Sequence, residues 1–137
     1  MKNTIILLTM LLFSGIGFAQ ESNNGKQLWA KSFLNEKAPE LTVETWISKK
    51  PDTEGKFVII DFWATWCGPC RKAIPELNEI AKEFSKDVVV IGISDEPVEK
   101  IKAMKEPVIE YYYGVDTKKT MDKILEIKGI PHVIIID

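Results

Sequence analysis

The stretch of sequence that decides the fold is residues 57–71, which read FVIIDFWATWCGPCR. Its first half, 57–63, is a nearly continuous apolar run, which is typical of a β-strand covered on both faces. From Cys70 onward, apolar side chains recur at spacings of three and four residues as far as Phe84, which predicts a helix with one buried stripe. A strand therefore leads directly into a helix, and two cysteines stand at the junction.

The two cysteines are placed for reversible disulfide chemistry. Three residues apart at the start of a helix, Cys67 and Cys70 lie on one face, close enough to form a disulfide and to open it again. The unpaired N–H groups and the positive end of the helix dipole favour a Cys67 thiolate and can lower its pKa from about 8.5 to roughly 3.5–7.5. That thiolate would attack a disulfide, and the better shielded Cys70 is suited to resolving the mixed disulfide that results.

Other interpretations of the cysteine pair fit less well. As a structural cross-link, a four-residue loop would contribute only about 2 kcal/mol, against about 3 for a loop of fifteen residues. As a zinc site, the pair would have only His132 and carboxylates as further ligands. Two ordinary buried thiols would not explain the intervening Gly68 and Pro69 or the position at a helix start. The strand-then-helix context favours a redox pair.

The rest of the chain completes an α/β pattern. The order strand, helix, strand, helix, helix, strand predicts a largely parallel or mixed central sheet flanked by helices. The further elements that we expect are a short extended segment at 41–47, a buried strand at 88–93, a helix from Pro97 to about Met104, an extended segment at 108–115, a helix capped by Asp116 or Thr117 and stopped by Gly129, and a buried strand at 133–136.

Composition narrows the functional classes. The 137 residues are 45% hydrophobic and carry a formal net charge of −2. Without a basic field, nucleic acid and anionic lipid surfaces are poor partners. Two cysteines and one histidine are too few for a disulfide-stapled mini-protein or an all-Cys/His zinc site.

The amino terminus predicts export. Lys2 precedes an uncharged, largely apolar stretch with small residues near Ala19, so we expect residues 1–19 to be a cleaved signal peptide. The alternative is an uncleaved membrane anchor, because the uncharged stretch just reaches spanning length. After cleavage we expect a polar lead-in at 20–37, a domain at 38–137 and no membrane span. An exported, periplasmic location would let disulfides form and persist.

Residues 61–71 and the later Gly129-Ile130-Pro131 resemble the thioredoxin superfamily, and within it the exported TlpA/ResA-like thiol-disulfide oxidoreductases. The resemblance extends over residues 38–137 and implies a thioredoxin-like fold. It makes Cys67 the nucleophile, Cys70 the resolving thiol and Pro131 a cis-proline that faces the disulfide.

Asp61 occupies the position of the buried carboxylate that, by the same resemblance, relays a proton to or from the resolving thiol. A carboxyl group in an apolar strand should have a raised pKa and can carry a proton near neutral pH. The alternative is a carboxylate that caps a backbone group at the strand end. The lysine that partners this acid in many thioredoxins is not evident, so the acid would work through water.

The substrate-binding surface that we expect surrounds the disulfide. Trp66 and Trp63 would form an apolar rim for a substrate polypeptide, although core packing explains Trp63 equally well. A lone His132 at a strand start is more often a packed side chain than a metal ligand. The residues that we assign to substrate binding are Trp66, Gly68, Pro69, Ile130 and Pro131.

These residues predict an enzyme that reduces disulfides of other exported proteins through the Cys67/Cys70 dithiol, with no organic cofactor or metal required. As the resemblance goes, Gly68 and Pro69 favour a reductant, which would need an electron-donating membrane partner. The alternative is a thioredoxin-fold module that binds copper through Cys67, Cys70 and His132, or a docking domain with idle cysteines. A third hypothesis, that the protein is a peroxide-reducing relative of these enzymes, is the one that the sequence favours least.

The length predicts an incomplete domain. After the strand at 133–136, a thioredoxin-like sheet needs a partner strand and a covering helix, about 25 to 30 residues at ordinary element lengths. The chain stops at Asp137. We therefore expect truncation before the last strand and helix, leaving an open sheet edge and one uncovered face.

Overall fold

The structure is a computed structural model that describes residues 28–137. The predicted signal peptide at 1–19 lies outside these residues, as does the first part of the lead-in. None of the helices among residues 28–137 combines the length and the apolar character that a membrane crossing requires.

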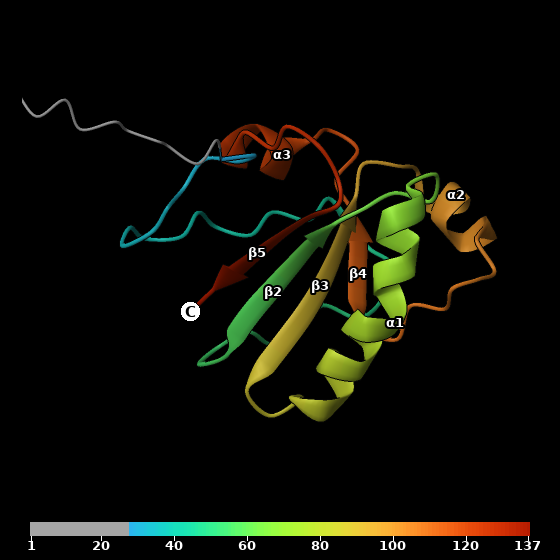
Figure 1. Cartoon of the computed structure of the whole chain (residues 1–137), viewed down its shortest axis with the longest axis horizontal. Coiled ribbons are helices and arrows are strands. Elements are labelled where there is room, and N and C mark those ends of the chain that lie inside the picture. Colours follow the sequence, from blue (N-terminus) through green and yellow to red (C-terminus); the bar gives the residue numbers. More distant parts are fainter. Residues whose placement is uncertain (1–27) are drawn as a thin grey trace, which may run out of the picture.

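Within residues 28–137, five strands form one mixed sheet, as the sequence predicts (Figure 1). The central strands β2, β3 and β4 run parallel, and the two outer strands run antiparallel to their neighbours. In sheet order, the strands are β1 (Thr45–Trp46), β4 (Tyr112–Val115), β3 (Val88–Ser94), β2 (Phe57–Phe62) and β5 (His132–Ile136). The expected mixed sheet is confirmed.

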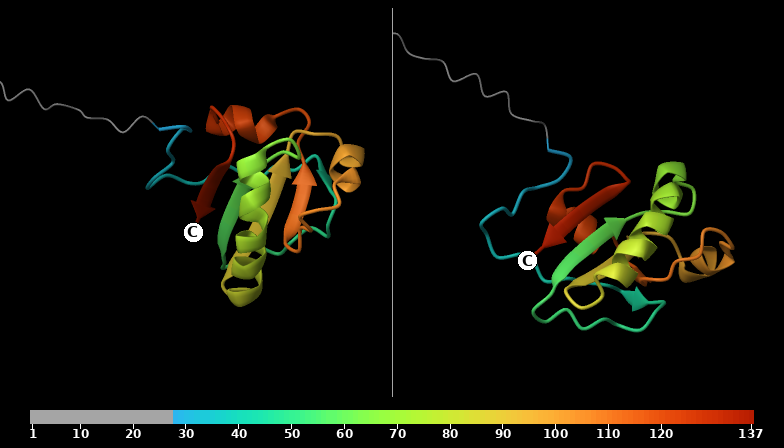
Figure 2. Two further views of the ribbon diagram at one scale, coloured as in Figure 1. Left: turned by 45° about the vertical axis from the view of Figure 1, so that its right-hand side comes forward. Right: turned by 60° about the horizontal axis from the view of Figure 1, so that its bottom comes forward.

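The helices of the described part of the chain are α1 (Gly68–Glu83), α2 (Val98–Ala103) and α3 (Thr120–Leu125). Helix α1 crosses one face of the sheet, as two views show (Figures 1 and 2), and packs mainly on β3. Its buried side chains, Cys70, Ile74 and Leu77, belong to one apolar cluster. Helix α3 contributes Met121 and Leu125 to a second cluster on the opposite face.

Strand β2 supplies side chains to both faces. Val58, Ile60 and Phe62 pack in the cluster with α3, whereas the alternate residue Ile59 packs against the cluster with α1. Because successive side chains of a strand point to opposite faces, Asp61 lies on the α1 face. The expectation of a strand covered on both faces is therefore confirmed for β2, and the alternation places the acid on the same side as the cysteines.

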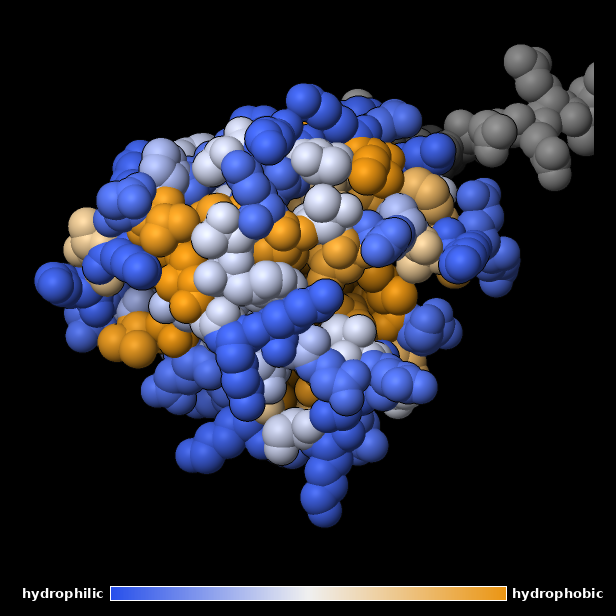
Figure 3. Space-filling model, turned by 180° about the vertical axis from the view of Figure 1, so that it is seen from behind, coloured by the Kyte–Doolittle hydropathy of each residue, from blue (hydrophilic) through white to orange (hydrophobic). Residues whose placement is uncertain are grey.

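Strand β5 differs from the buried strand expected at 133–136. It pairs only with β2 among the described strands, so it lies at the sheet edge. Ile134 and Ile136 pack against the α3 cluster, but Val133 is 48% and Ile135 67% exposed on the other face. On the side of the molecule opposite to the view of Figure 1, the surface shows apolar patches among hydrophilic side chains (Figure 3).

Other boundaries also differ from the sequence expectations. Phe84, expected in the buried stripe, is the C-cap of α1 and is 47% exposed. Helix α3 ends before Glu126, which adopts a left-handed backbone with φ of 51°, rather than at Gly129. The Ile127 N–H then bonds back to the Asp122 carbonyl at 3.0 Å. The N-cap residue of α3 is Lys119, not Asp116 or Thr117 as expected, although Asp116 Oδ2 accepts the Met121 N–H at 2.8 Å.

Candidate active site

The start of α1 holds the two cysteines together. Cys67 is the N-cap residue with an extended backbone, and its Sγ accepts the Cys70 N–H at 3.3 Å. The two residues form a disulfide with a Cα–Cα distance of 5.3 Å, which lies within the usual range for such bonds. The cap position and the helix dipole both favour negative charge on the Cys67 sulfur. The strand-to-helix junction thus produces the pair that the sequence predicts.

The surroundings of the two sulfurs are unequal. Cys67 is 4% exposed and Cys70 is fully buried. The intervening Gly68 and Pro69 are exposed, and Trp66 is 68% exposed. A partner molecule therefore meets the exposed Trp66, Gly68 and Pro69, which flank Cys67 in sequence, before it meets Cys70. This arrangement fits an attacking Cys67 and a shielded Cys70.

The two tryptophans have separate roles. Trp63 is only 1% exposed and packs in the cluster that also contains Cys67 and Cys70. It is part of the core beneath the disulfide, and the expectation that it forms a rim is wrong. The Trp63 ring lies against Gly92 of β3, in the space that a side chain at Gly92 would need. Trp66 alone of the pair remains available to a substrate.

A groove of ≈ 380 Å³ runs beside the exposed Trp66. Its apolar wall includes Ile130, which also packs against both apolar clusters. Its charged wall includes Lys119, whose Nζ lies 2.6 Å from an Asp95 carboxylate oxygen. The Ile130–Pro131 peptide bond is cis, as the resemblance implies, and Pro131 is exposed. The structure therefore brings the expected Trp66 and Ile130 to one groove.

Asp61 is a buried carboxyl group, only 1% exposed. Its Oδ2 has no hydrogen-bond partner among the described residues. Burial raises the pKa of Asp61 from 3.8 to about 6, because the charged form loses its hydration. The prediction of a raised pKa is confirmed. The orphaned oxygen also argues against a carboxylate that simply caps the strand end.

Sequence reasoning missed Tyr111, which precedes β4 and is 4% exposed. Its hydroxyl affects the pKa of Asp61, yet neither that hydroxyl nor Asp61 Oδ2 meets the geometry of a hydrogen bond. The two groups are close enough to interact electrostatically. The only sequence signal was the run of three tyrosines at 111–113, which predicts a strand rather than a site.

Sequence reasoning also missed Glu96, which is 5% exposed after β3. Its carboxylate accepts hydrogen bonds from the backbone N–H and the hydroxyl of Thr65, and it pairs with Lys100. Burial opposes the ionisation of Glu96, but hydrogen bonds from Lys100 and Thr65 outweigh burial and lower its pKa. Glu96 thereby fixes the loop that leads into Cys67.

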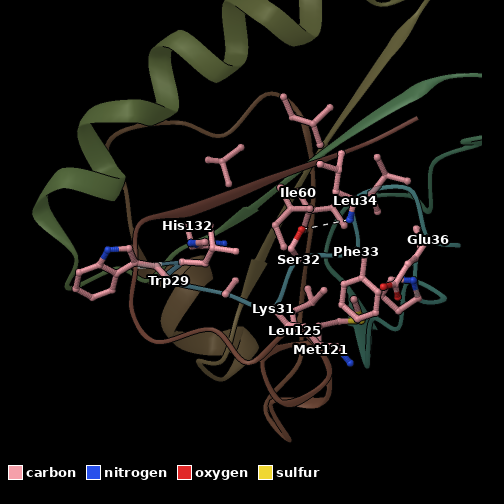
Figure 4. A pocket seen from close by; sticks show the side chains of 18 of the residues that line it. Trp29, Lys31, Ser32, Phe33, Leu34, Glu36, Ile60, Met121, Leu125 and His132 are labelled. Carbon is pink, nitrogen blue, oxygen red and sulfur yellow. Dashed lines mark hydrogen bonds between the residues drawn. The ribbon is translucent and has the colours of Figure 1, made fainter. Parts of the chain in front are cut away.

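His132 lies away from this constellation. His132 on β5 stands opposite Phe62 on β2. The Phe62 side chain packs in the cluster on the α3 face of the sheet. His132 lines the apolar pocket between the segment at 28–39, α3 and β5, as Figure 4 shows. Within residues 28–137, no group of three or more His, Cys, Asp or Glu side chains is placed to hold a metal ion. His132 therefore gives the copper alternative no geometric support.

Known proteins are similar to this chain in sequence and in fold. The Bacillus subtilis thioredoxin-like protein YneN is 34% identical over 68 residues, which are 47% of this chain and 40% of that protein. The chain spans about half the length of the curated relatives it matches, 40% and 52% for the first two.

Two solved structures are also similar. A proposed protein disulfide isomerase from Bacteroides thetaiotaomicron is 33% identical, with 73% of this chain and 69% of that chain covered and a TM-score of 0.62. The exposed lipoprotein thioredoxin of Streptococcus pneumoniae is 27% identical, with 61% and 68% covered and a TM-score of 0.51.

A family model matches residues 34–137, the whole of the sheet and its helices. The match includes the strand-to-helix junction, the disulfide and the cis-proline segment. With this fold and these relatives, it places the protein in the thioredoxin superfamily, and the chain belongs to the AhpC/TSA family.

Proposed function

We propose that this protein is an exported, TlpA/ResA-like thiol-disulfide oxidoreductase that reduces disulfides of other exported proteins. The observation that carries the proposal is the Cys67–Cys70 disulfide at the start of α1, beside an exposed Trp66. A pair in this position can open and close without unfolding the chain, because its loop is short and lies at the surface end of the helix. The relatives named as a thioredoxin and as a protein disulfide isomerase support this chemistry.

The first step consumes the substrate disulfide. The Cys67 thiolate attacks one substrate sulfur, so that a Cys67–substrate disulfide forms while the substrate disulfide breaks. The departing substrate thiolate takes a proton from solvent. Attack at Cys67 is favoured by the N-cap position, where the Cys70 N–H already points at the Cys67 sulfur and the helix dipole stabilises negative charge.

The second step releases the substrate. The Asp61 carboxylate takes the proton from the Cys70 thiol, and the Cys70 sulfur attacks Cys67 Sγ. The Cys67–Cys70 disulfide forms as the mixed disulfide breaks, and the second substrate thiolate leaves. Two electrons have then passed from the dithiol to the substrate. Asp61 suits this task because its pKa of about 6 allows it both to accept and to return a proton near neutral pH.

The groove beside Trp66 is the proposed docking surface for the substrate polypeptide. Trp66 and Ile130 line this groove, and we assign the exposed Gly68, Pro69 and Pro131 to the same docking surface. An exposed aromatic ring next to an apolar wall favours an extended peptide with an apolar side chain close to its cysteine. Protein disulfides are therefore preferred over small charged disulfides.

Export and electron supply complete the proposal. The apolar segment at 1–19 acts as a cleaved signal peptide, and the pneumococcal relative is itself an exposed lipoprotein. A reductant in an oxidising compartment is spent after one turnover unless it is recharged. We therefore propose that an electron-donating membrane protein reduces the Cys67–Cys70 disulfide after each cycle.

Trapping of the mixed disulfide tests the proposal. The full chain is expressed in a Gram-negative host as wild type, Cys70→Ser and Cys67→Ser. Because Cys70→Ser cannot resolve the intermediate, it should accumulate disulfide-linked adducts with exported proteins. Cys67→Ser should form none, and the mature chain should have lost residues 1–19. Equal adduct levels in the two variants, or adducts with cytosolic proteins only, would refute the proposed function.

A further inference from the structure

Three buried polar atoms on the α1 side of the sheet have no hydrogen-bond partner in the described chain. They are Asp61 Oδ2, Trp63 Nε1 and the Tyr111 hydroxyl. Buried polar atoms are almost always paired, because an unpaired one forfeits its hydration without compensation. Each residue is at most 4% exposed. Three such atoms on one side of a sheet indicate a functional arrangement.

Gly92 lies next to all three of these residues. In the β2–β3 pairing it stands directly opposite Asp61. A Cβ atom on Gly92 would lie 3.0 Å from Trp63 Nε1 and 3.1 Å from Tyr111 Cε2. A side chain there would press on both rings, so the glycine leaves space for them. Its absence of a side chain lets the Trp63 and Tyr111 rings lie against the strand beside Asp61.

The surroundings of Asp61 contain few other titratable groups. Helix α1 presents Cys67 and Cys70, which are joined as a disulfide. Strand β3 presents Gly92, and strand β5 places Val133 opposite Asp61. Tyr111 is the one titratable side chain of residues 28–137 that shifts the pKa of Asp61, and it acts in the lowering direction against burial. None of the lysines among the described residues shifts the pKa of Asp61.

We infer that Tyr111 is the positioning residue for Asp61, and that its hydroxyl donates a hydrogen bond to the Asp61 carboxylate whenever that carboxylate is ionised. The inference rests on the proposed function, since the ionised carboxylate is the base that receives the Cys70 proton. In the disulfide form neither Asp61 Oδ2 nor the Tyr111 hydroxyl has a hydrogen-bond partner among the described residues. The tyrosine supplies the stabilisation of the charged acid that a buried lysine would otherwise provide.

Tyr111 is suited to donate and not to exchange its own proton. Burial and the neighbouring Asp61 carboxylate raise the pKa of Tyr111 above its ordinary value, so the hydroxyl stays protonated. The proton that leaves Cys70 therefore stops at Asp61 and returns to solvent from there. Tyr111 changes only how strongly Asp61 holds that proton.

The test compares Tyr111→Phe with the matched control Tyr112→Phe in the full chain. Both variants remove one hydroxyl group, but Tyr112 packs against the α3 cluster on the opposite face of the sheet. Carbon-13 NMR of labelled aspartate carboxyl groups, assigned with Asp61→Asn, follows the titration of Asp61 in oxidised and in reduced protein. The pH profile of exchange with a disulfide peptide is recorded in parallel.

Tyr111→Phe should move the Asp61 midpoint upward by at least about half a pH unit, because a donor to the charged form is lost. The rise of the exchange rate with pH should move by the same amount, and Tyr112→Phe should leave both unchanged. An Asp61 midpoint that stays in place in Tyr111→Phe, or that moves equally in Tyr112→Phe, overturns the inference. If the wild type shows no exchange at any pH, the proposed function fails, and the NMR titration still decides the pairing.

Discussion

Glu96 holds Thr65 through both of its carboxylate oxygens. Oε2 accepts the Thr65 backbone N–H at 2.5 Å, and Oε1 accepts the Thr65 hydroxyl at 3.0 Å. Thr65 stands two residues before Cys67, so the segment after β3 is tied to the loop that carries the nucleophile. The Lys100 ammonium, 2.5 Å from Oε1, compensates the buried charge.

Replacing this carboxylate should weaken the protein. Glu96→Gln removes the charge and one acceptor oxygen, which should lower the free energy of unfolding by about 1–3 kcal/mol. Urea unfolding of the oxidised protein measures the change, with the exposed Glu99→Gln on α2 as control. Because the folded-state pKa of Glu96 is lowered, the advantage of the wild type should be present above pH 4.5, the ordinary value, and disappear below it. Identical midpoints for the two variants would contradict this role.

Asp61 should have the opposite effect on stability. Its folded-state pKa of about 6 lies above the ordinary 3.8, so the folded state holds the proton more tightly than the unfolded state. Stability should therefore fall as pH rises from about 4 to about 6 and stay lower above that range. The shift corresponds to about 3 kcal/mol. At about pH 8, Asp61→Asn should be more stable than the wild type by up to that amount.

Urea unfolding of oxidised protein across this pH range checks the Asp61 prediction. The exposed Asp87→Asn serves as the matched control, and its stability should follow the wild type at every pH. The difference between wild type and Asp61→Asn should vanish near pH 4. A difference that stays constant with pH would mean that the Asp61 charge is not the cause.

Trp66 should matter only for protein substrates. Trp66→Ala removes a ring that is 68% exposed beside Cys67, so KM for a protein disulfide should rise about tenfold, as expected for the loss of an aromatic anchor. The rate with a small disulfide such as oxidised glutathione should change little. The control is Trp29→Ala, since Trp29 is 65% exposed but lines the pocket of Figure 4 instead. Equal losses with both substrates would point to a damaged active site.

Local sequence patterns predict the centre of this fold well. The apolar run of β2, the spacing of α1 and the cysteines at their junction each depend on neighbours within a few residues. The start of a helix shortly after Asp116, whose side chain accepts the Met121 N–H, was predictable for the same reason. The helix end at Glu126 was not, because a left-handed glutamate has no sequence signature comparable to the nearby Gly129.

Contacts between residues far apart in the chain explain the features that the sequence did not predict. Tyr111 and Glu96 become site residues only because the sheet order places β3 between β2 and β4, and no pattern within their own segments records that order. The exposure of Val133 and Ile135 has the same origin, since an apolar run does not reveal whether its strand lies at the centre or at the edge of a sheet. Trp63 was ambiguous until the packing beside Gly92 was known.

The measurement that tests the central claim most directly is a redox titration of the full chain. The protein is equilibrated in buffers of defined thiol-to-disulfide ratio, and free thiols are counted by alkylation and mass spectrometry. The account predicts that Cys67 and Cys70 pass reversibly, as a two-electron couple, between the disulfide and the dithiol. A pair that remains in one state across the accessible range of potentials, or that oxidises only to bonds between chains, would contradict it.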